Sequence, residues 1–437
     1  MEIDQTTYDD LSLISDGNEF SVFQKMDLTR THIGREHLRR LFMNPFSDLQ
    51  RIRETQQILS LIASRQKAWP MVITNGTIMV MEKFYETVLD RIPDGSLIGA
   101  LAYKLLHAPS FSLLRYSVRH FADFVADFYG LIELFDDPGT PLAMRSRLER
   151  ARRLLEMGPV SSLAKPLGKK GLSITETVKI GAYLRDRFRD TAKELIEIYG
   201  RLDAWFSMSM ATEHLELNFP EFIEQEKPVL ETESLRHILL EKPIAYPVKL
   251  NEKVNFLFLT GANMAGKSTF IRAVGCGVFL AHLGMGVPAK SMRLTPFDGI
   301  LSNINVEDNI SKGESLFFNE VQRIKHTLVK INKEQRWLVL IDELFKGTNV
   351  EDAMKCSITV IKGLIKIRRS LFVLSTHLYE IAEELRSFDN IGFKYFETSV
   401  VDDQFDFSYQ IRDGISNDRV GYLILKREKV VQMLEEL

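Results

Sequence analysis

A short apolar strand that runs into a glycine-bounded loop constrains this chain more than any other feature of its sequence. The loop reads Gly261-Ala262-Asn263-Met264-Ala265-Gly266-Lys267-Ser268-Thr269 and matches the pattern G-x-x-x-x-G-K-[ST]. In such a loop, backbone N–H groups and the N-terminus of the next helix surround the phosphates of a nucleotide, and the lysine adds a positive charge. The pattern therefore predicts that Gly261 to Thr269 bind the phosphates of ATP or GTP, with Ser268 as a ligand of Mg²⁺.

The residues on both sides of the loop support this prediction. Val254–Leu259 is apolar and rich in β-forming residues, as expected of a buried parallel strand. Phe270–Val274 continues in a helical pattern, and the next proline is Pro288. A glycine turn that binds no ligand is the alternative, but such a turn does not require this order of strand, loop and helix. We therefore expect a nucleotide site at the end of the strand.

A second predicted strand, Trp337–Ile341, ends in two acids, Asp342 and Glu343, about 75 residues after the loop. Because functional groups gather at the carboxyl ends of parallel strands, we expect both acids to face the nucleotide. Asp342 would hold Mg²⁺, directly or through water, and Glu343 would orient or deprotonate the attacking water. The alternative is that the two acids only mark the exposed end of a strand.

Two further residues are candidates for contact with phosphate. His377 follows a third predicted strand, Leu371–Leu374, so we expect its imidazole at the same edge of the sheet, within reach of the γ-phosphate. Ser315 has the residue type that caps helices, and the N-terminus of the helix after it would be a second anion site. A structural histidine and an ordinary helix cap are the alternatives.

The pattern of apolar residues divides the chain into two domains. From about Phe20 to Phe219 apolar residues recur every three or four positions, which predicts an all-helical domain. Beyond Pro220, short apolar runs alternate with helices, as in βαβ units around a largely parallel sheet. We predict an α + α/β fold, with a helical domain in residues 1–222 and a nucleotide-binding domain in residues 223–437 that ends in a helix. The expected strands are Val254–Leu259, Gly299–Ile304, Trp337–Ile341, Leu371–Leu374 and Phe405–Ile411.

Composition excludes several classes of protein. No run among the 437 residues approaches the 18 or so apolar residues of a membrane span, and the start carries no secretory signal. We therefore expect no membrane partner. Cys276 and Cys356 lie in apolar helical patterns without metal-ligand spacing, which indicates buried free thiols and a cytoplasmic protein. The net charge of −3 neither indicates nor excludes nucleic acid.

Four of these segments, taken in order, resemble the ATPase domain of the MutS family of DNA mismatch-repair proteins. The most specific part is Asn263-Met264 before Gly266-Lys267-Ser268-Thr269, and the segment 27–31 is similar to the entry of the MutS core or lever domain. The resemblance implies a helical lever domain followed by an ABC-type P-loop ATPase that uses ATP and Mg²⁺. It also implies a dimer in which Ser315 reaches the nucleotide of the partner subunit, and levers that close around duplex DNA. The four segments are residues 260–269, 313–320, 341–348 and 375–377.

The chain also departs from the family pattern. Only about eighteen residues precede Glu19-Phe20, so we expect a short form without the N-terminal mismatch-reading and connector domains. Phe84-Tyr85-Glu86 matches the Phe-x-Glu of the reading domain, but it lies in a helical pattern and is expected to be core. Lys346 stands where the family has an arginine, so a point charge replaces a planar guanidinium.

These observations lead to two hypotheses. The first is a DNA-dependent ATPase: a homodimeric, ATP-gated clamp on duplex or branched DNA, in repair or recombination, that does not read mismatches. The second is an ATP-gated scaffold that holds a protein partner and no nucleic acid. Tyr246 and Tyr395 are candidates for stacking on the base. Basic residues of the helical half are candidates for DNA contact, although Glu149 and Glu156 interleave with them: Arg145, Arg147, Arg150, Arg152, Arg153, Lys165, Lys169 and Lys170.

Overall fold

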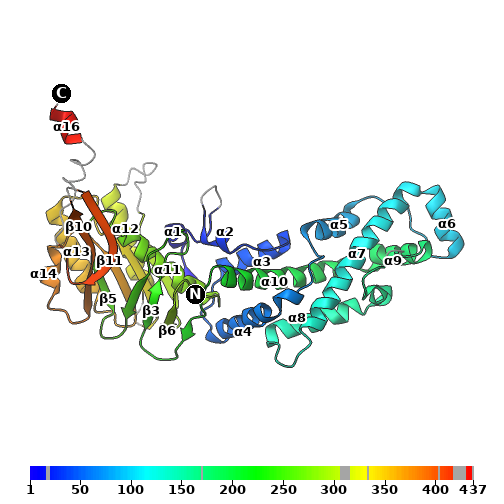
Figure 1. Ribbon diagram of the computed structural model, residues 1–437, viewed down its shortest axis with the longest axis horizontal. Helices are drawn as coiled ribbons and strands as arrows, with labels where there is room; N and C mark the ends of the chain where they lie inside the picture. Colours follow the sequence, from blue (N-terminus) through cyan, green and yellow to red (C-terminus); the bar gives the residue numbers. More distant parts are fainter. Residues whose placement is uncertain are drawn as a thin grey trace. The chain divides into compact units, whose positions relative to one another are not determined.

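The computed structural model describes residues 1–15, 20–168, 171–305, 315–331, 334–401, 404–416 and 430–435 (Figure 1). The chain forms two compact units. The sheet unit contains Met1–Lys25, Asn44–Arg53 and His214–Leu437, and the helical unit contains Met26–Met43 and Glu54–Glu213.

This division differs from the predicted boundary at residue 222, because two N-terminal segments belong to the sheet unit. Strand β1 (Glu2–Ile3) pairs in parallel with β7 (Gly299–Asn303), and α1 (Gln5–Asp10) follows it. The backbone N–H of Phe46 donates to the carbonyl of His282 at 2.9 Å. A two-residue strand and a six-residue helix are too short to show periodicity, so their place was not predictable from the pattern.

The main sheet of the sheet unit has seven strands in the order β1-β7-β8-β9-β5-β10-β11. All neighbouring pairs are parallel except β10 and β11, which are antiparallel. The mixed α/β architecture with a largely parallel sheet is therefore as predicted. The remaining strands of this sheet are β5 (Phe256–Thr260), β8 (Trp337–Asp342), β9 (Leu371–Ser375), β10 (Ile391–Val401) and β11 (Gln404–Asp413).

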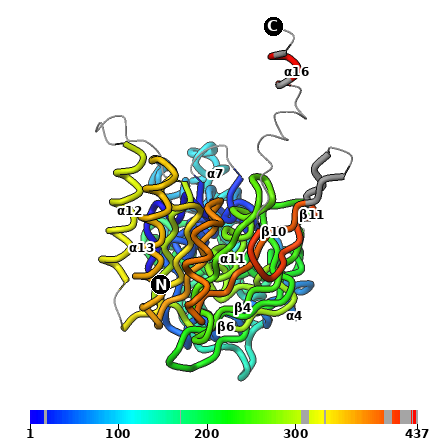
Figure 2. The backbone as a smooth tube through the Cα atoms, turned by 90° about the vertical axis from the view of Figure 1, so that its left-hand side faces the viewer, coloured from blue at the N-terminus to red at the C-terminus, as the bar shows by residue number. Residues whose placement is uncertain are grey.

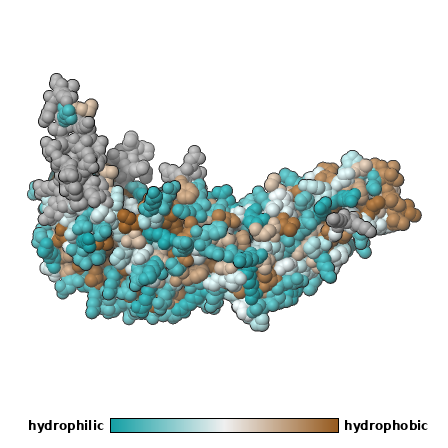
Figure 3. All heavy atoms as spheres, viewed as in Figure 1, coloured by the Kyte–Doolittle hydropathy of each residue, from teal (hydrophilic) through white to brown (hydrophobic). Residues whose placement is uncertain are grey.

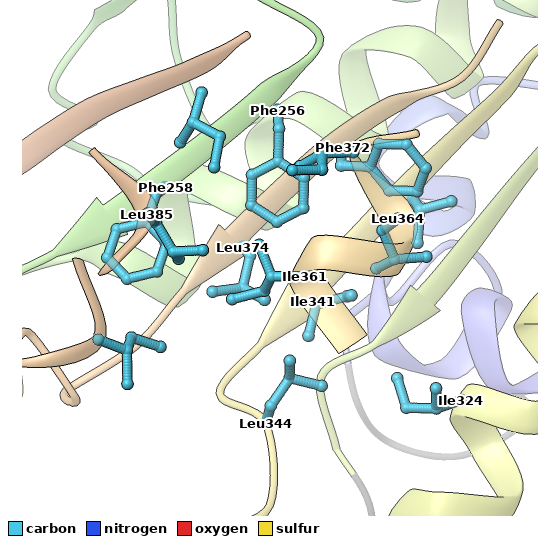
Figure 4. Packing of buried hydrophobic residues seen from close by; sticks show 14 of the residues in the cluster. Phe256, Phe258, Ile324, Ile341, Leu344, Ile361, Leu364, Phe372, Leu374 and Leu385 are labelled. Carbon is cyan, nitrogen blue, oxygen red and sulfur yellow. The ribbon is translucent and has the colours of Figure 1, made fainter. Parts of the chain in front are cut away.

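Helices cover both faces of this sheet. On one face, Phe256 and Phe372 stack at 5.7 Å and share a buried cluster with Ile361 of α13 (Figure 4). On the other face, the Leu340 side chain lies against Gly275 of α11. Coverage on both sides explains why the strands are continuous apolar runs rather than alternating ones. The helices are α11 (Lys267–His282), α12 (Leu316–Lys330), α13 (Val350–Leu364) and α14 (Ile381–Leu385), with α12 next to α13 in Figure 2.

A second sheet of four strands in the sheet unit was not predicted from the sequence. Its order is β2-β6-β3-β4, and β3 pairs antiparallel with both neighbours. Its strands are short, and β4 alternates buried and exposed residues, which gives a weaker signal than a continuous apolar run. The bounds are β2 (Glu221–Phe222), β3 (Leu230–Leu235), β4 (Tyr246–Leu250) and β6 (Ser291–Leu294).

In its described residues the helical unit consists of helices, turns and loops. Its long central helix α7 packs against α5, α6, α8 and α9. Phe84 is buried and lies edge-on to Phe121 at 5.6 Å, as expected of a core aromatic. The helices are α3 (His32–Met43), most of α4 (Leu49–Arg65), α5 (Asn75–Glu86), α6 (Leu97–Leu106), α7 (Ala108–Leu134), α8 (Leu142–Leu155), α9 (Ile174–Arg187) and α10 (Arg189–His214), with 3₁₀ turns at Gln66–Ala68 and Gly158–Leu163.

Helix α2 (Val22–Met26) ends where the chain passes from the sheet unit to the helical unit, and α16 (Val430–Glu435) is the described part of the predicted C-terminal helix. No single helix in the described residues is long and apolar enough to cross a membrane. The pair α6 and α7, bent by 115°, meets that criterion together by length and composition.

Candidate nucleotide-binding site

A cavity of about 610 Å³ lies at the carboxyl ends of strands β5, β8 and β9. It collects side chains from the predicted phosphate loop, the acidic pair and the histidine after β9. It therefore brings together residues that are more than one hundred positions apart in the sequence. The lining residues are Leu240, Lys242, Ile244, Tyr246, Asn263, Met264, Gly266, Lys267, Ser268, Thr269, Asp342, Glu343, Lys346, His377 and Tyr409.

The phosphate loop owes its shape to three residues with positive φ. Gly261 has φ 143°, Met264 has φ 68° and Gly266 has φ 104°. Gly266 also forms the N-cap of α11, where it offers no side chain to bond the first backbone N–H groups of the helix. Those groups are left for a ligand, and the helix dipole favours an anion there. Gly261, Ala262 and Ala265 lie outside the cavity lining and form the rear of the loop.

Lys267 is the first residue of α11, and its side chain is only 6% exposed. Its ammonium donates hydrogen bonds to the carbonyls of Gly261 at 2.8 Å and Ala262 at 2.9 Å. Burial lowers the pKa of Lys267 to about 8, although the nearby carboxylates of Asp342 and Glu343 oppose this shift. The ammonium of Lys267 is thus a partly desolvated positive charge. A bound phosphate would offset the free-energy cost of burying this charge.

The two acids are held by strand β9. The Ser375 hydroxyl donates to the carboxylate of Asp342, and the backbone N–H of Glu343 donates to the Ser375 carbonyl at 2.9 Å. Glu343 has φ 64°, a left-handed conformation that turns the chain at the end of β8. Its carboxylate lies 3.7 Å from the ammonium of Lys346. Both acids therefore face the cavity from fixed backbone positions.

His377 reaches the same cavity from the end of β9. Its Nε2 lies 3.4 Å from the Nζ of Lys267. Burial and then the positive charge of Lys267 lower the pKa of His377, so the imidazole is neutral at physiological pH. If the ammonium donates to Nε2, the ring carries its proton on Nδ1.

Three lining residues come from the segment between β3 and β4, which no motif marked. Leu240 and Ile244 are 45% and 41% exposed, and Lys242 lies between them. Tyr409 of β11 lines the same cavity. The contribution of these four residues depends on how the segment before β4 and strand β11 fold back onto the loop, and a local sequence pattern does not carry that information.

Of the two tyrosines predicted to stack on the base, only Tyr246 lines the cavity. It is buried, with its ring in edge contact with Phe270 at 5.6 Å and with Phe396 at 5.5 Å. The structure instead places Tyr409 beside the loop, where a Cβ on Gly266 would lie 3.4 Å from its ring. Tyr395 is not part of the lining.

Ser315 caps α12 by accepting a hydrogen bond from the Phe318 N–H at 3.3 Å, and it is not part of the cavity lining. One turn further along, the buried carboxylate of Glu320 accepts hydrogen bonds from the N–H groups of Lys346 at 3.0 Å and Gly347 at 3.3 Å. Glu320 therefore ties the first turns of α12 to the loop that follows the acidic pair.

Four of the eight basic residues predicted to contact DNA make contacts within the helical unit. Arg150 pairs with Glu194 at 2.7 Å and Arg152 with Asp136 at 2.8 Å. Arg147 lies over the Trp205 ring at 5.3 Å, and Arg145 donates to backbone carbonyls at Pro138 and Thr140. Lys169 and Lys170 lie outside the described residues.

Comparison with known protein families matches residues 257–434 to MutS domain V. Among curated proteins, one relative is the DNA mismatch repair protein spellchecker 1 of Drosophila melanogaster, which is 30% identical to this chain over 228 residues. The alignment covers 50% of this chain and 25% of the relative. The chain therefore matches about a quarter of the length of that curated protein.

Proposed function

The chain belongs to the MutS family, whose domain V it carries in residues 257–434, and from this premise we propose that it binds and hydrolyses ATP at the cavity described above. One observation carries the proposal: the phosphate loop, the acidic pair and the half-buried His377 line a single cavity. Three strands deliver these groups to one edge of the sheet, which is where nucleotide sites form in α/β folds.

Each residue has a role that follows from its position. Lys267 and the N-terminus of α11 would hold the β- and γ-phosphates. Glu343, beside Lys346, would orient or deprotonate the attacking water. His377, neutral and in contact with Lys267, would act as a hydrogen-bonding partner of the γ-phosphate rather than as a second cation.

The cavity also suits a magnesium ion. Ser268 and Asp342 both line it, and hydroxyl and carboxylate oxygens are the ligands that Mg²⁺ prefers. The Ser375 hydroxyl occupies one carboxylate oxygen of Asp342 and so orients the other. A bound ion would neutralise negative charge on the phosphoryl group that is transferred.

For the base, the exposed apolar side chains of Leu240 and Ile244 and the ring of Tyr409 offer flat apolar surface near the loop. Such surfaces fit a purine. We take ATP as the nucleotide because mismatch-repair-related ATPases form the family to which the chain belongs.

We further propose a homodimer in which each Ser315 reaches the nucleotide of the partner subunit. The support is that Ser315 begins a helix, where an anion is favoured, and yet does not line the cavity of its own chain. In the cytoplasm, this dimer would act as an ATP-gated clamp on duplex or branched DNA, in repair or recombination.

A second function keeps the ATPase and replaces DNA with a protein partner. The observation in its favour is that Arg147, Arg150 and Arg152 of α8 are engaged in contacts within the chain. Phosphate binding would have to break those contacts or use other cations.

The test is the steady-state ATPase rate of the full chain without DNA and with homoduplex, mismatched and four-way junction DNA at several salt concentrations. Stimulation that weakens as salt rises supports the DNA-dependent ATPase. An ATPase that no DNA stimulates or binds at low salt favours the scaffold. Absence of hydrolysis under all conditions would reject both.

A further inference from the structure

Helix α6 in the helical unit presents an apolar face that no other described residue covers. Leu97, Ile98, Leu101, Leu105 and Leu106 are 63%, 82%, 41%, 79% and 78% exposed; we call these five side chains the α6 patch. The opposite side of the helix is buried through Ala100 and Tyr103 and packs against α7 and α9. The patch is the brown area over α6 at the right of Figure 3.

The α6 patch is large for a surface feature. Five aliphatic side chains at these exposures present roughly 600 Å² of apolar surface, the upper end of what the largest patch on a typical monomer shows. Leu113 and Tyr116 of α7, at 36% and 54% exposed, extend the same apolar character. A patch of this size commonly marks a binding surface.

The charged residues of α6 and of the first half of α7 are all basic. Residues 97–122 contain no aspartate or glutamate, while Lys104, Arg115 and Arg119 are all exposed. The nearby acid Asp90 lies 3.0 Å from His107 and accepts a hydrogen bond from Ser110. Beyond this segment, Asp94 lies in the loop before α6, which also carries Arg91, and Lys179 of α9 lies close to Gly95. The surroundings of the patch are therefore basic.

We propose that the α6 patch docks onto the surface of an anionic lipid bilayer. The helix would lie in the interface with its apolar face among the acyl chains. Lys104 and Arg115 would contact lipid phosphates, and Tyr116 would sit at the level of the head groups, where amphipathic rings are favoured.

The geometry favours this occupant over a second copy of the chain. Two copies meeting through α6 would bring Lys104 and Arg115 close to their own equivalents, whereas anionic lipids attract them. A single convex helix also buries little surface against its own copy, while a fluid bilayer adapts to it.

The helix lies on the membrane and does not cross it. Its ten residues span about 15 Å, half of the hydrocarbon core. Helix α7, which together with α6 has the length of a span, buries most of its apolar residues inside the helical unit. The expectation of no membrane partner rested on the absence of a spanning segment, which a surface helix does not need.

The test is flotation of the full chain with vesicles of phosphatidylcholine alone and with vesicles containing phosphatidylglycerol. Three variants are compared with the wild type: Ile98→Glu with Leu105→Glu in the patch, Lys104→Glu with Arg115→Glu beside it, and Leu142→Glu as the control. Leu142 is 72% exposed at the start of α8, so it matches the patch residues in exposure. Circular dichroism and the ATPase rate show that each variant is folded.

We expect binding to the anionic vesicles that weakens as salt rises. The patch variant should bind the vesicles at least about tenfold more weakly than the wild type. The charge variant should lose its preference for anionic vesicles, and Leu142→Glu should bind like the wild type. No binding of the wild type to anionic vesicles would overturn the proposal, as would equal binding to neutral vesicles. A dimer that the patch variant dissociates, without any vesicle binding, would assign the patch to a second copy. The sheet unit carries the nucleotide site, so none of these outcomes decides the ATPase.

Discussion

The ammonium of Lys267 lies 3.4 Å from Nε2 of His377, inside the nucleotide cavity. Burial lowers the pKa of Lys267 to about 8. The free protein therefore loses this proton as the pH rises through 8, while a bound phosphate requires the charged lysine. Nucleotide affinity should fall as the pH rises from 7 to 9, and binding above pH 8 should take up a proton.

Calorimetry of ATP binding in buffers of different ionisation enthalpy measures this uptake. The Glu343→Gln background prevents turnover during the titration. Lys267→Arg is the control, because arginine stays charged and should remove the pH dependence whatever its affinity. An affinity of the wild type that is unchanged between pH 7 and pH 9 would contradict the assignment.

Two substitutions separate binding from hydrolysis. Lys267→Ala removes the ammonium that bonds the loop carbonyls and should abolish detectable nucleotide binding. Glu343→Gln keeps the size of the side chain but removes the base, so it should retain ATP and lower turnover by about a hundredfold or more. Equilibrium binding of a fluorescent ATP analogue and release of phosphate report the two steps. Brisk turnover by Glu343→Gln would remove this residue from the chemistry.

The buried carboxylate of Glu320 should control turnover without contacting the nucleotide. Glu320→Gln leaves one of the two N–H groups of Lys346 and Gly347 without an acceptor. We expect the free energy of unfolding to fall by about 1.5–3 kcal/mol. Because the same loop carries Lys346 next to Glu343, kcat should fall on the order of tenfold with little change in KM.

Gln322→Ala is the matched control for Glu320, since it changes an exposed residue of the same helix. It should leave both unfolding and turnover as in the wild type. Urea denaturation and steady-state kinetics measure the two effects. If Glu320→Gln lowers stability but keeps the wild-type kcat, Glu320 has only a structural role.

Gly347 marks a close approach between two segments of the site. A Cβ at this position would lie 2.5 Å from the backbone nitrogen of Phe317, an atom that cannot rotate away. Gly347→Ala should therefore push the start of α12 and its cap Ser315 away from the loop, and lower stability by about 1–3 kcal/mol. Gly363→Ala in α13 is the control: a Cβ there meets nothing within 4 Å, so this change should stabilise by up to about 1 kcal/mol. Thermal unfolding of both variants tests the contrast.

The parts of the site that the sequence predicts are those that a local pattern defines. The loop around Lys267 and the acids at the end of β8 depend on a strand, a turn and a helix that are contiguous in the chain. Tyr409 and Leu240 enter the same cavity only because β10, the partner of β11, pairs with the distant strand β5 and the segment before β4 folds over the loop. Pairing between distant strands leaves no periodic trace in the residues that it brings together.

The same reasoning explains the boundary of the helical unit. Helical periodicity identified its long helices, because their apolar faces are buried against one another. It did not separate Met1–Lys25 from them, since β1 owes its place to pairing with β7, almost three hundred residues later. Nor did it indicate that Phe46 bonds His282.

His282 should make the sheet unit sensitive to acid. It is fully buried, its Nδ1 lies 2.6 Å from the Phe46 carbonyl, and its Nε2 accepts from the Phe297 N–H at 3.1 Å, so the ring is neutral with its proton on Nδ1. Burial lowers its pKa from 6.5 to about 4. The unfolded chain therefore binds a proton below pH 6.5 that the folded chain binds only below about pH 4. Stability from this residue is fully present above pH 6.5 and is lost between pH 6.5 and 4, by about 2 kcal/mol at pH 5.

Urea denaturation of the wild type and of His282→Gln at pH 7.5, 6 and 5 tests this assignment. Glutamine can donate to Phe46 and accept from Phe297 without titrating, so it isolates the protonation of the ring. The gap in unfolding free energy between the two proteins should shift by about 2 kcal/mol in favour of the variant between pH 7.5 and 5. His237, whose pKa burial also lowers to about 4, is present in both proteins, so its contribution cancels. Parallel pH profiles for the two proteins would show that the buried His282 ring does not govern acid stability.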